Sequence, residues 1–381
     1  MQLPLKTEAL VVNKPGGEFE MTPIVIQDLR PDELLVEMRY SGVCHTDFYL
    51  QEGSLGALLE FPAIAGHEGA GIIRAIGSQV TDKSLQVGDP VLLSFTACGE
   101  CGHCVKDRNF SRCSAFPALN LTATPRPDRS SPAKLLLDGQ PVRSQFFGQS
   151  SFSRFSAVRE NCVVKCPYPD DMALYAPMGC GYQTGAGTIL NVLKPKPDQT
   201  VAVFGAGSVG FAAIMAAASI PVKQIIAIDI VEQKLALAKE LGATQTINSS
   251  KLQGGGVVAA IKSVTGGQGV DFAVDTTGVA AVIEKMLMCL SFGGTAASVG
   301  APPREANINV NPGAFFAGMN KWVTVSEGDS HPPEFIPQLI DLHRQGKFPV
   351  DRISKVYPVA GLKKAVSDMH AGTVIKPIIE F

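Results

Sequence analysis

Four cysteines lie close together in the chain. Cys98, Cys101 and Cys104 share the pattern Cys-x-x-Cys-x-x-Cys, and Cys113 follows after eight further residues. Four thiolates at such short spacing can complete a tetrahedral shell around zinc and leave no position open for a substrate. This segment therefore predicts a structural zinc site.

A second set of metal-binding side chains is spread along the chain. Cys44 lies in SGVCHTD, His67 and Glu68 lie in AGHEGAG, and Cys180 lies in PMGCGYQTG. Two cysteines and one histidine with a free fourth position are typical of a catalytic zinc site, where the open position binds a substrate. Their spacing in the sequence alone does not join them into one site.

A glycine-rich turn follows an apolar run in the segment VAVFGAGSVGFAAIMAAA. Gly205, Gly207 and Gly210 allow a tight turn and a close approach of the backbone to a pyrophosphate at the start of a helix. Asp229 ends the next apolar run, QIIAIDI, where a carboxylate can accept hydrogen bonds from a ribose and would repel a 2′-phosphate. The pattern predicts an NAD site rather than an NADP site. Lys234 is either a second contact to this ribose or an exposed helix lysine.

The length and composition limit the class of protein. A chain of 381 residues is too long for one hydrophobic core, so two domains are expected. With 45% hydrophobic and 18% charged residues and 38 glycines, it has the composition of a folded α/β protein. The 33 basic and 35 acidic residues give a net charge of -2, which argues against a nucleic-acid partner.

Neither a secretory signal nor a membrane span is recognisable. The start, MQLPLKTEALVV, lacks a basic segment followed by an apolar one, and no apolar run reaches roughly 18 to 20 residues. The nine cysteines are an odd number, and their clustering favours metal binding over disulfides. We expect a cytosolic protein without a membrane partner.

The pattern of apolar residues changes along the chain. Short alternating runs between residues 10 and 93 predict an all-β region, and the Pro- and Ser-rich stretch 119–147 predicts a long surface loop. After residue 185, apolar strands alternate with helical patterns, which indicates a parallel sheet. The expected strands are VAVFGAG, IIAIDI, DFAVDTT and GTAASVG, followed near the end by the helix EFIPQLIDLHRQGKF and the strand TVIKPIIEF.

Five motifs in a fixed order resemble the zinc-dependent medium-chain alcohol dehydrogenase family over nearly the whole chain. They are GHEGAGIIRAIGSQV, the four-cysteine segment, GCGYQTGAG, GAGSVG and KPII. The resemblance implies an α/β protein with a GroES-like β-barrel catalytic domain from residues 1–180 and 321–381, including a structural-zinc lobe at 95–115. A Rossmann domain, a doubly wound parallel sheet that binds NAD(H), would occupy 181–320. It also implies a homodimer or homotetramer joined through the Rossmann domains.

The resemblance assigns roles to single residues. Cys44, His67 and Cys180, with Glu68 beside them, would hold the catalytic zinc, and Asp47 and Glu68 would orient or tune these ligands. Thr46 would take the proton of the alcohol. The residues implied to contact the cofactor are His45, Thr184, Gly205, Gly207, Val209, Gly210, Asp229, Lys234 and Lys376.

The chain departs from the family pattern in two places. Tyr49 stands where a branch of the family has the histidine that ends the proton relay, so solvent or the cofactor ribose would finish the transfer. The gap before Cys113 is one residue longer than usual, which leaves His103 or water as alternatives for the fourth structural ligand.

The segments FFGQSSFSRFSAV and CHTD most resemble the aryl- or benzyl-alcohol dehydrogenase branch. The expected reaction is a reversible alcohol-to-aldehyde conversion on an aromatic or other bulky primary alcohol. Phe95, Leu58, Phe48 and Phe315 are the expected pocket residues. The alternatives are a pathway-specific carbonyl reductase, a polyol or formaldehyde-glutathione dehydrogenase, a non-catalytic zinc-binding relative and a thiol redox sensor.

Overall fold

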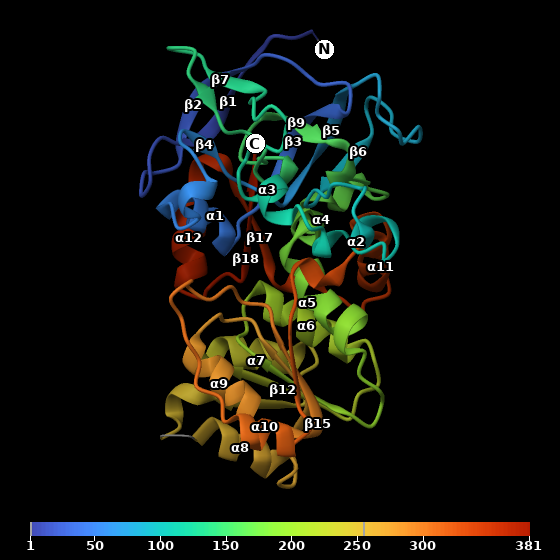
Figure 1. Ribbon diagram of the computed structural model, residues 1–381, viewed down its shortest axis with the longest axis vertical. Helices are drawn as coiled ribbons and strands as arrows, with labels where there is room; N and C mark the ends of the chain where they lie inside the picture. The colour runs from blue at the N-terminus through green and yellow to red at the C-terminus, as the bar shows by residue number, and fades with distance from the viewer. Residues whose placement is uncertain (1, 254–255) are drawn as a thin grey trace. The chain divides into compact units, whose positions relative to one another are not determined.

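The computed structural model describes residues 2–253 and 256–381. The chain divides into two compact units, each described here by itself (Figure 1). The terminal unit holds residues 1–180, 331–337 and 353–381, so it contains both ends of the chain. The central unit holds residues 181–330 and 338–352.

Two largely antiparallel sheets form the terminal unit. One has the order β4-β1-β2-β7-β8, and the other has the order β10-β6-β5-β3-β18-β17, with β9 also paired to β3. The last strand, β18, pairs antiparallel with β3, which joins the end of the chain to its beginning. The strands are β1 (Leu5–Val12), β2 (Glu20–Ile26), β3 (Glu33–Gly42), β4 (Ala63–Ile64), β5 (Gly69–Ile76), β6 (Pro90–Leu93), β7 (Ala133–Leu135), β8 (Pro141–Val142), β9 (Phe155–Arg159), β10 (Val163–Lys165), β17 (Ser354–Pro358) and β18 (Lys376–Glu380).

Short helices connect these strands. They lie at α1 (His45–Glu52), α2 (Gly102–Val105), α3 (Phe116–Asn120), α4 (Met172–Tyr175) and α12 (Leu362–His370). The core between the sheets and α1 is filled by apolar side chains such as Val11, Ile64, Phe95 and Phe152. Burial of this apolar surface holds the loops between the strands in place.

The stretch 119–147 differs from the surface loop predicted for it. β7 and β8 form a small hairpin within it, and β7 pairs antiparallel with β2, with Ile24 opposite Leu135. Arg126 in the same stretch is only 2% exposed. Strands of three and two residues are too short to show an alternating pattern, so composition alone suggested a loop.

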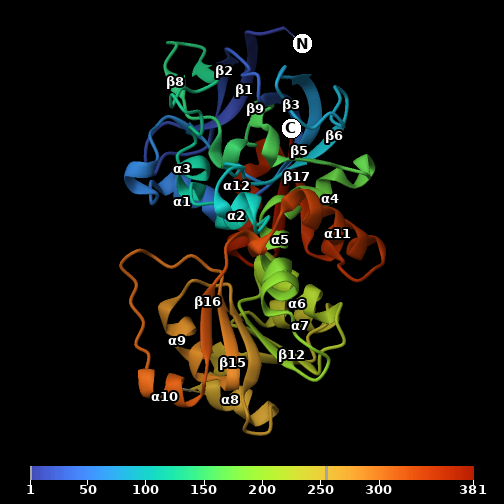
Figure 2. The same ribbon diagram turned by 45° about the vertical axis from the view of Figure 1, so that its right-hand side comes forward.

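A six-stranded parallel sheet forms the central unit, with the order β13-β12-β11-β14-β15-β16. Its middle strand, TVAVF, is buried at every position, as expected for a parallel sheet covered on both faces. Figure 2 shows α6 and α7 on one face of this sheet and α9 on the other. The strands are β11 (Thr200–Phe204), β12 (Gln224–Asp229), β13 (Gln245–Asn248), β14 (Val270–Asp275), β15 (Leu290–Ser298) and β16 (Lys321–Thr324); the helices are α5 (Gly181–Gly187), α6 (Ser208–Ala218), α7 (Glu232–Glu240), α8 (Gly256–Val264), α9 (Ala280–Met288), α10 (Pro312–Ala317) and α11 (Pro332–Arg344), the last of which begins in the terminal unit.

The second boundary between the units differs from the one expected at residue 321. Lys321–Thr324 forms β16, the edge strand of the parallel sheet, and the central unit continues to Ser330 and again over 338–352. The stretch KWVT was expected in the catalytic domain, because four residues carry little pattern of their own. Among the described residues, no helix is long and apolar enough to cross a membrane.

Candidate functional site

Four side chains from separate segments of the terminal unit meet at one point. Each of Cys44, His67, Glu68 and Cys180 offers a ligand atom, and these atoms all lie within 4.8 Å of one another. Cys44 precedes α1, His67 and Glu68 lie between β4 and β5, and Cys180 follows the turn Ala176–Gly179. The fold therefore joins residues that the sequence alone left separate.

The imidazole of His67 is oriented for a ligand. Its Nδ1 lies 2.9 Å from Oδ1 of Asp47, and both side chains are fully buried. The opposite nitrogen, Nε2, is buried without a hydrogen-bond partner among the described residues. A buried nitrogen left unpaired is costly, and a metal ion bound with the two sulfurs would satisfy it. This chemistry fits zinc.

Electrostatics favour a thiolate in this cluster. Hydrogen bonding with Cys180, aided by the charge of His67, lowers the pKa of Cys44 well below its usual value despite burial. Burial disfavours a charged imidazole, but Asp47 and Cys44 raise the pKa of His67 well above its usual value. Because metals bind the thiolate form of cysteine, the low pKa of Cys44 suits metal binding.

A buried ion pair lies behind the ligands. Nζ of Lys376 lies 3.0 and 2.9 Å from the two carboxylate oxygens of Glu68 and donates to the carbonyl of Val43 at 3.1 Å. Burial raises the pKa of Glu68 even though Lys376 opposes the shift. The amine of Lys376 is buried against Glu68 because β18 pairs with β3 beside Val43, and its contact with the cofactor stays a prediction.

The four clustered cysteines form a second centre. The sulfurs of Cys98, Cys101, Cys104 and Cys113 all lie within 4.8 Å of one another. Cys101 and Cys104 have sulfurs 3.5 Å apart, and those of Cys98 and Cys104 are 3.9 Å apart. Four sulfurs with no other donor in the group match a closed zinc site.

The longer gap before Cys113 does not remove it from this centre. Arg108 adopts a left-handed conformation with φ 50°, and a short turn at Phe110–Arg112 follows, with the Asn109 side chain accepting from the backbone N–H of Arg112. These turns absorb the extra residue. His103, the alternative ligand, instead pairs with Asp107 at 2.9 Å and is half exposed.

The glycine-rich turn opens α6 in the central unit. Gly205 has φ +94°, and a Cβ on Gly210 would lie 1.9 Å from the carbonyl oxygen of Gly205. A Cβ on Gly207, which caps α6, would meet nothing within 4 Å. The turn thus packs tightly against its strand and leaves the helix N-terminus open, an arrangement that fits a pyrophosphate.

Asp229 lies at the carboxyl end of β12 beside this turn. One carboxylate oxygen accepts from the backbone N–H of Ala206 at 2.6 Å, and the other accepts from Ile230 and Val231 at 2.7 and 2.9 Å. The side chain is partly exposed. Asp229 therefore fixes the glycine turn while remaining accessible to a ligand.

The remaining predicted cofactor and relay residues are placed as follows. The hydroxyl of Thr46 lies 3.8 Å from the sulfur of Cys44, and His45 is exposed with its ring 6.2 Å from that of Phe48. In the central unit, Thr184 is 8% exposed and faces Glu327 at 3.5 Å. Val209 on α6 and Lys234 on α7 are partly buried.

Aromatic rings surround His67. Phe147 stacks on its imidazole at 4.6 Å, and Phe146 meets it edge-on at 5.7 Å. The ring centroid of Phe116 lies 6.1 Å from that of Phe147 and 5.7 Å from that of Phe95, a predicted pocket residue. We did not predict Phe116, Phe146 or Phe147 near this site, although the two adjacent phenylalanines in FFGQSSF could have indicated an aromatic cluster.

The other three predicted pocket residues have the following surroundings within their own units. Phe48 lines a separate hollow of about 570 Å³ with Phe19 and Leu362. Leu58 lies partly buried in the turn Gly56–Leu58, and Phe315 on α10 packs against the core of the central unit. Their part in a substrate pocket stays a prediction.

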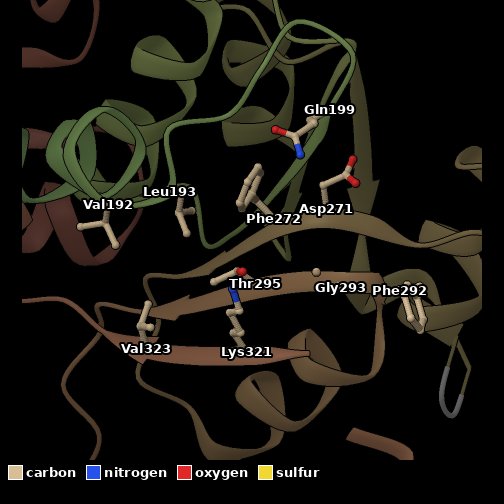
Figure 3. Close-up of a pocket in the computed structure, with 11 residues that line it drawn as sticks. Val192, Leu193, Gln199, Asp271, Phe272, Phe292, Gly293, Thr295, Lys321 and Val323 are labelled. Carbon is tan, nitrogen blue, oxygen red and sulfur yellow. The ribbon is translucent and has the colours of Figure 1, made fainter. Parts of the chain in front are cut away.

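A further hollow, of about 480 Å³, lies in the central unit (Figure 3). Asp271 and Lys321 line it near the amino ends of β14 and β16, together with Thr295 of β15, which is opposite Lys321 in the sheet. Asp229 and the glycine turn lie instead at the carboxyl ends of the strands. This hollow is therefore distinct from the candidate cofactor site.

Comparisons with known proteins find alcohol dehydrogenases that match this chain over nearly its whole length. The family described as alcohol dehydrogenase GroES-like domain matches residues 30–168, and the zinc-binding dehydrogenase family matches residues 208–343. Geraniol dehydrogenase of Castellaniella defragrans is 38% identical over 382 residues, 99% of this chain and 98% of that protein.

Two solved structures are also similar to this chain. An alcohol dehydrogenase zinc-binding domain protein from Burkholderia ambifaria has a TM-score of 0.93 at 39% identity, covering 99% of both chains. Benzyl alcohol dehydrogenase from Acinetobacter calcoaceticus has a TM-score of 0.91 at 37% identity, again covering 99% of both chains. With the two cysteine-containing clusters and the glycine turn, these similarities show that the chain belongs to the zinc-dependent medium-chain alcohol dehydrogenase family.

Proposed function

We propose that this protein catalyses the reversible, NAD-linked oxidation of a primary alcohol to an aldehyde at a zinc held by Cys44, His67 and Cys180. The main support for this proposal is that two cysteine sulfurs lie close to the ring of His67, whose Nε2 is buried without a hydrogen-bond partner among the described residues. Glu68, the fourth member of the group, is engaged by Lys376. Its carboxylate therefore acts behind the ligands and leaves the fourth position for substrate.

We propose that a second zinc in each subunit is structural. Cys98, Cys101, Cys104 and Cys113 supply four sulfurs and no open position. Such a shell contributes to folding rather than to the reaction.

A zinc held by Cys44, His67 and Cys180 would supply Lewis-acid chemistry, which lowers the pKa of a bound alcohol hydroxyl. Asp47 holds the imidazole of His67 through Nδ1, which directs Nε2 toward the sulfurs. The Thr46 hydroxyl, 3.8 Å from the Cys44 sulfur, accepts the proton that the alcohol loses and passes it on. Because Tyr49 replaces a relay histidine, solvent or the cofactor ribose receives that proton.

NAD, which accepts the hydride, would bind at the glycine turn of α6. Gly205, Gly207 and Gly210 would admit its pyrophosphate to the helix N-terminus, and Asp229 would accept from the adenosine ribose. His45 and Lys234 are further proposed contacts, to the pyrophosphate and the ribose. A carboxylate at Asp229 disfavours the 2′-phosphate of NADP by charge repulsion.

We propose an allylic or benzylic primary alcohol as the substrate class. Two relatives are named for geraniol and benzyl alcohol, and both molecules carry the alcohol carbon next to an unsaturated carbon. The rings of Phe116, Phe146 and Phe147 make the region around His67 apolar and aromatic, which suits the unsaturated hydrocarbon part of such an alcohol.

We further propose a cytosolic homo-oligomer. No disulfide joins any of the nine cysteines, as expected in a reducing compartment. β16 lies at an edge of the parallel sheet, and its Trp322 is 42% exposed. An open edge with an exposed aromatic ring favours pairing with a second copy.

The direct test combines elemental analysis with a cofactor assay. Zinc per subunit is measured, and NADH absorbance is followed while benzylic, allylic, aliphatic and polyol substrates are offered with NAD or NADP. Two zincs and NAD-linked turnover on benzylic or allylic alcohols would support the proposal. Zinc at Cys44 without turnover on any of these alcohols would contradict it, and a preference for NADP would contradict the cofactor assignment.

A further inference from the structure

The loop that carries His67 lies against the segment Gln149–Phe152. The backbone N–H of Ser151 donates to Gly66 at 2.9 Å, and that of Phe152 donates to Ala65 at 3.1 Å. A Cβ on Gly66 would lie only 2.4 Å from the nitrogen of Phe152. Glycine is required here because the two backbones approach so closely.

The side chain of Gln149 continues this pairing along the loop. Its Oε1 accepts from the backbone N–H of Gly69 at 3.0 Å, and its Nε2 donates to the carbonyl of His67 at 2.9 Å. Nε2 also donates to the carbonyl of Ser94 at 2.8 Å. The amide is fully buried, and this single orientation satisfies its oxygen and both of its N–H groups.

A further hydrogen bond extends the connection to Cys180. The hydroxyl of Ser94 donates to the carbonyl of Gly179 at 2.7 Å, and Gly179 directly precedes Cys180. A Cβ on Gly179 would lie 2.0 Å from the carbonyl oxygen of Leu93, so the two backbones are in close contact. One chain of buried hydrogen bonds thus runs from His67 through Gln149 and Ser94 to Gly179.

We propose that Gln149 is a positioning residue that sets the separation of His67 from Cys180 in the metal centre. The inference rests on the proposed catalytic zinc site. Asp47 orients the imidazole ring, whereas Gln149 holds the backbone on which that ring is mounted. Its loss would therefore change how tightly and in what geometry metal is held.

The test compares two buried glutamines of the same segment. Gln149→Met removes the amide beside the metal loop. Gln145→Met is the matched control, because Gln145 is also fully buried and donates to Glu33 at 2.8 Å and Ala157 at 3.1 Å, away from that loop. Zinc transfer to a chromophoric chelator and the visible spectrum of the cobalt-substituted protein are measured for both, and Cys44→Ser identifies the signal of this centre.

Gln149→Met should release this metal roughly tenfold faster or more and shift the cobalt bands. Gln145→Met should lower the melting temperature without either change. Ser94→Ala removes the hydroxyl that donates to Gly179 and should shift release in the same direction by a smaller factor, so the proposal stays testable if Gln149→Met does not fold.

Unchanged release and spectrum in both Gln149→Met and Ser94→Ala would overturn the positioning role, as would an equal change in Gln145→Met. If the wild-type protein shows no metal signal that Cys44→Ser removes, the proposed catalytic zinc site itself is wrong, and with it the proposed function.

Discussion

Asp47 holds three parts of the metal centre at once. Its Oδ1 lies 2.9 Å from Nδ1 of His67 and accepts from the backbone N–H of Gly66 at 2.9 Å, and its Oδ2 accepts from Cys44 at 3.0 Å. Replacing Asp47 by Asn exchanges one oxygen for a donor that cannot satisfy these N–H groups. We expect metal affinity to fall about 10- to 100-fold, measured by competition with a chelator.

The surface pair of His103 and Asp107 provides the control for that change. It has the same 2.9 Å separation, but both side chains are more than half exposed. Asp107→Asn should leave metal affinity at wild-type strength. An Asp47→Asn variant with the affinity of wild type would show that the carboxylate does not support the ligand.

Cys113→Ser tests the second centre. Cys113 is 4% exposed and joins the sulfurs of Cys98, Cys101 and Cys104. Because a closed zinc shell contributes folding energy, the variant should lose one zinc per subunit and melt at a lower temperature, with turnover per remaining folded enzyme little changed. His103→Ala should keep its zinc, and normal zinc content and melting temperature in Cys113→Ser would remove Cys113 from the ligand set.

Asp229→Gly tests the cofactor assignment. The change removes the carboxylate that would meet the adenosine ribose and that now accepts from Ala206, Ile230 and Val231. Loss of a charge-assisted hydrogen bond of about 1.5–3 kcal/mol should lower kcat/KM for NAD by about 10- to 100-fold. NADP should lose less, since its phosphate is no longer repelled. Equal losses for both cofactors would mean that Asp229 only supports the turn.

Motifs whose chemistry depends on local spacing could be predicted from the sequence. The four-cysteine cluster and the glycine turn each occupy one short segment, so their geometry follows from nearby residues. The strands around the glycine turn were also predicted, because a buried parallel strand is an unbroken apolar run.

Contacts between distant segments could not be predicted in this way. Gln149 reaches His67 and Ser94 over 82 and 55 residues, and Phe147, whose backbone has φ 52°, stacks on His67 from a segment 80 residues away. The hairpin of β7 and β8 was missed since its strands are too short to show a period. Such features depend on tertiary packing rather than on local propensity.

The buried pair of Arg126 and Glu33 ties the stretch 119–147 to the start of β3. Arg126 donates to the two carboxylate oxygens of Glu33 at 2.8 and 2.6 Å, and Glu33 is fully buried. Burial alone would raise the pKa of Glu33, but Arg126, the backbone of Arg30 and Gln145 together lower it below its ordinary value. A carboxyl whose pKa is lowered by folding stabilises the protein above that value and loses this contribution as the pH falls through its folded-state pKa.

Arg126→Met should therefore destabilise the protein by about 3–5 kcal/mol at pH 7, because a buried carboxylate loses its partner. The difference from wild type should shrink as the pH falls and Glu33 becomes protonated. Urea denaturation at several pH values measures both effects. The surface pair of Arg30 and Asp128, with side chains 30% and 57% exposed, is the control, and Arg30→Met should cost no more than about 1 kcal/mol. A loss in Arg126→Met that is independent of pH would mean that packing of the long side chain, rather than its charge, holds this stretch in place.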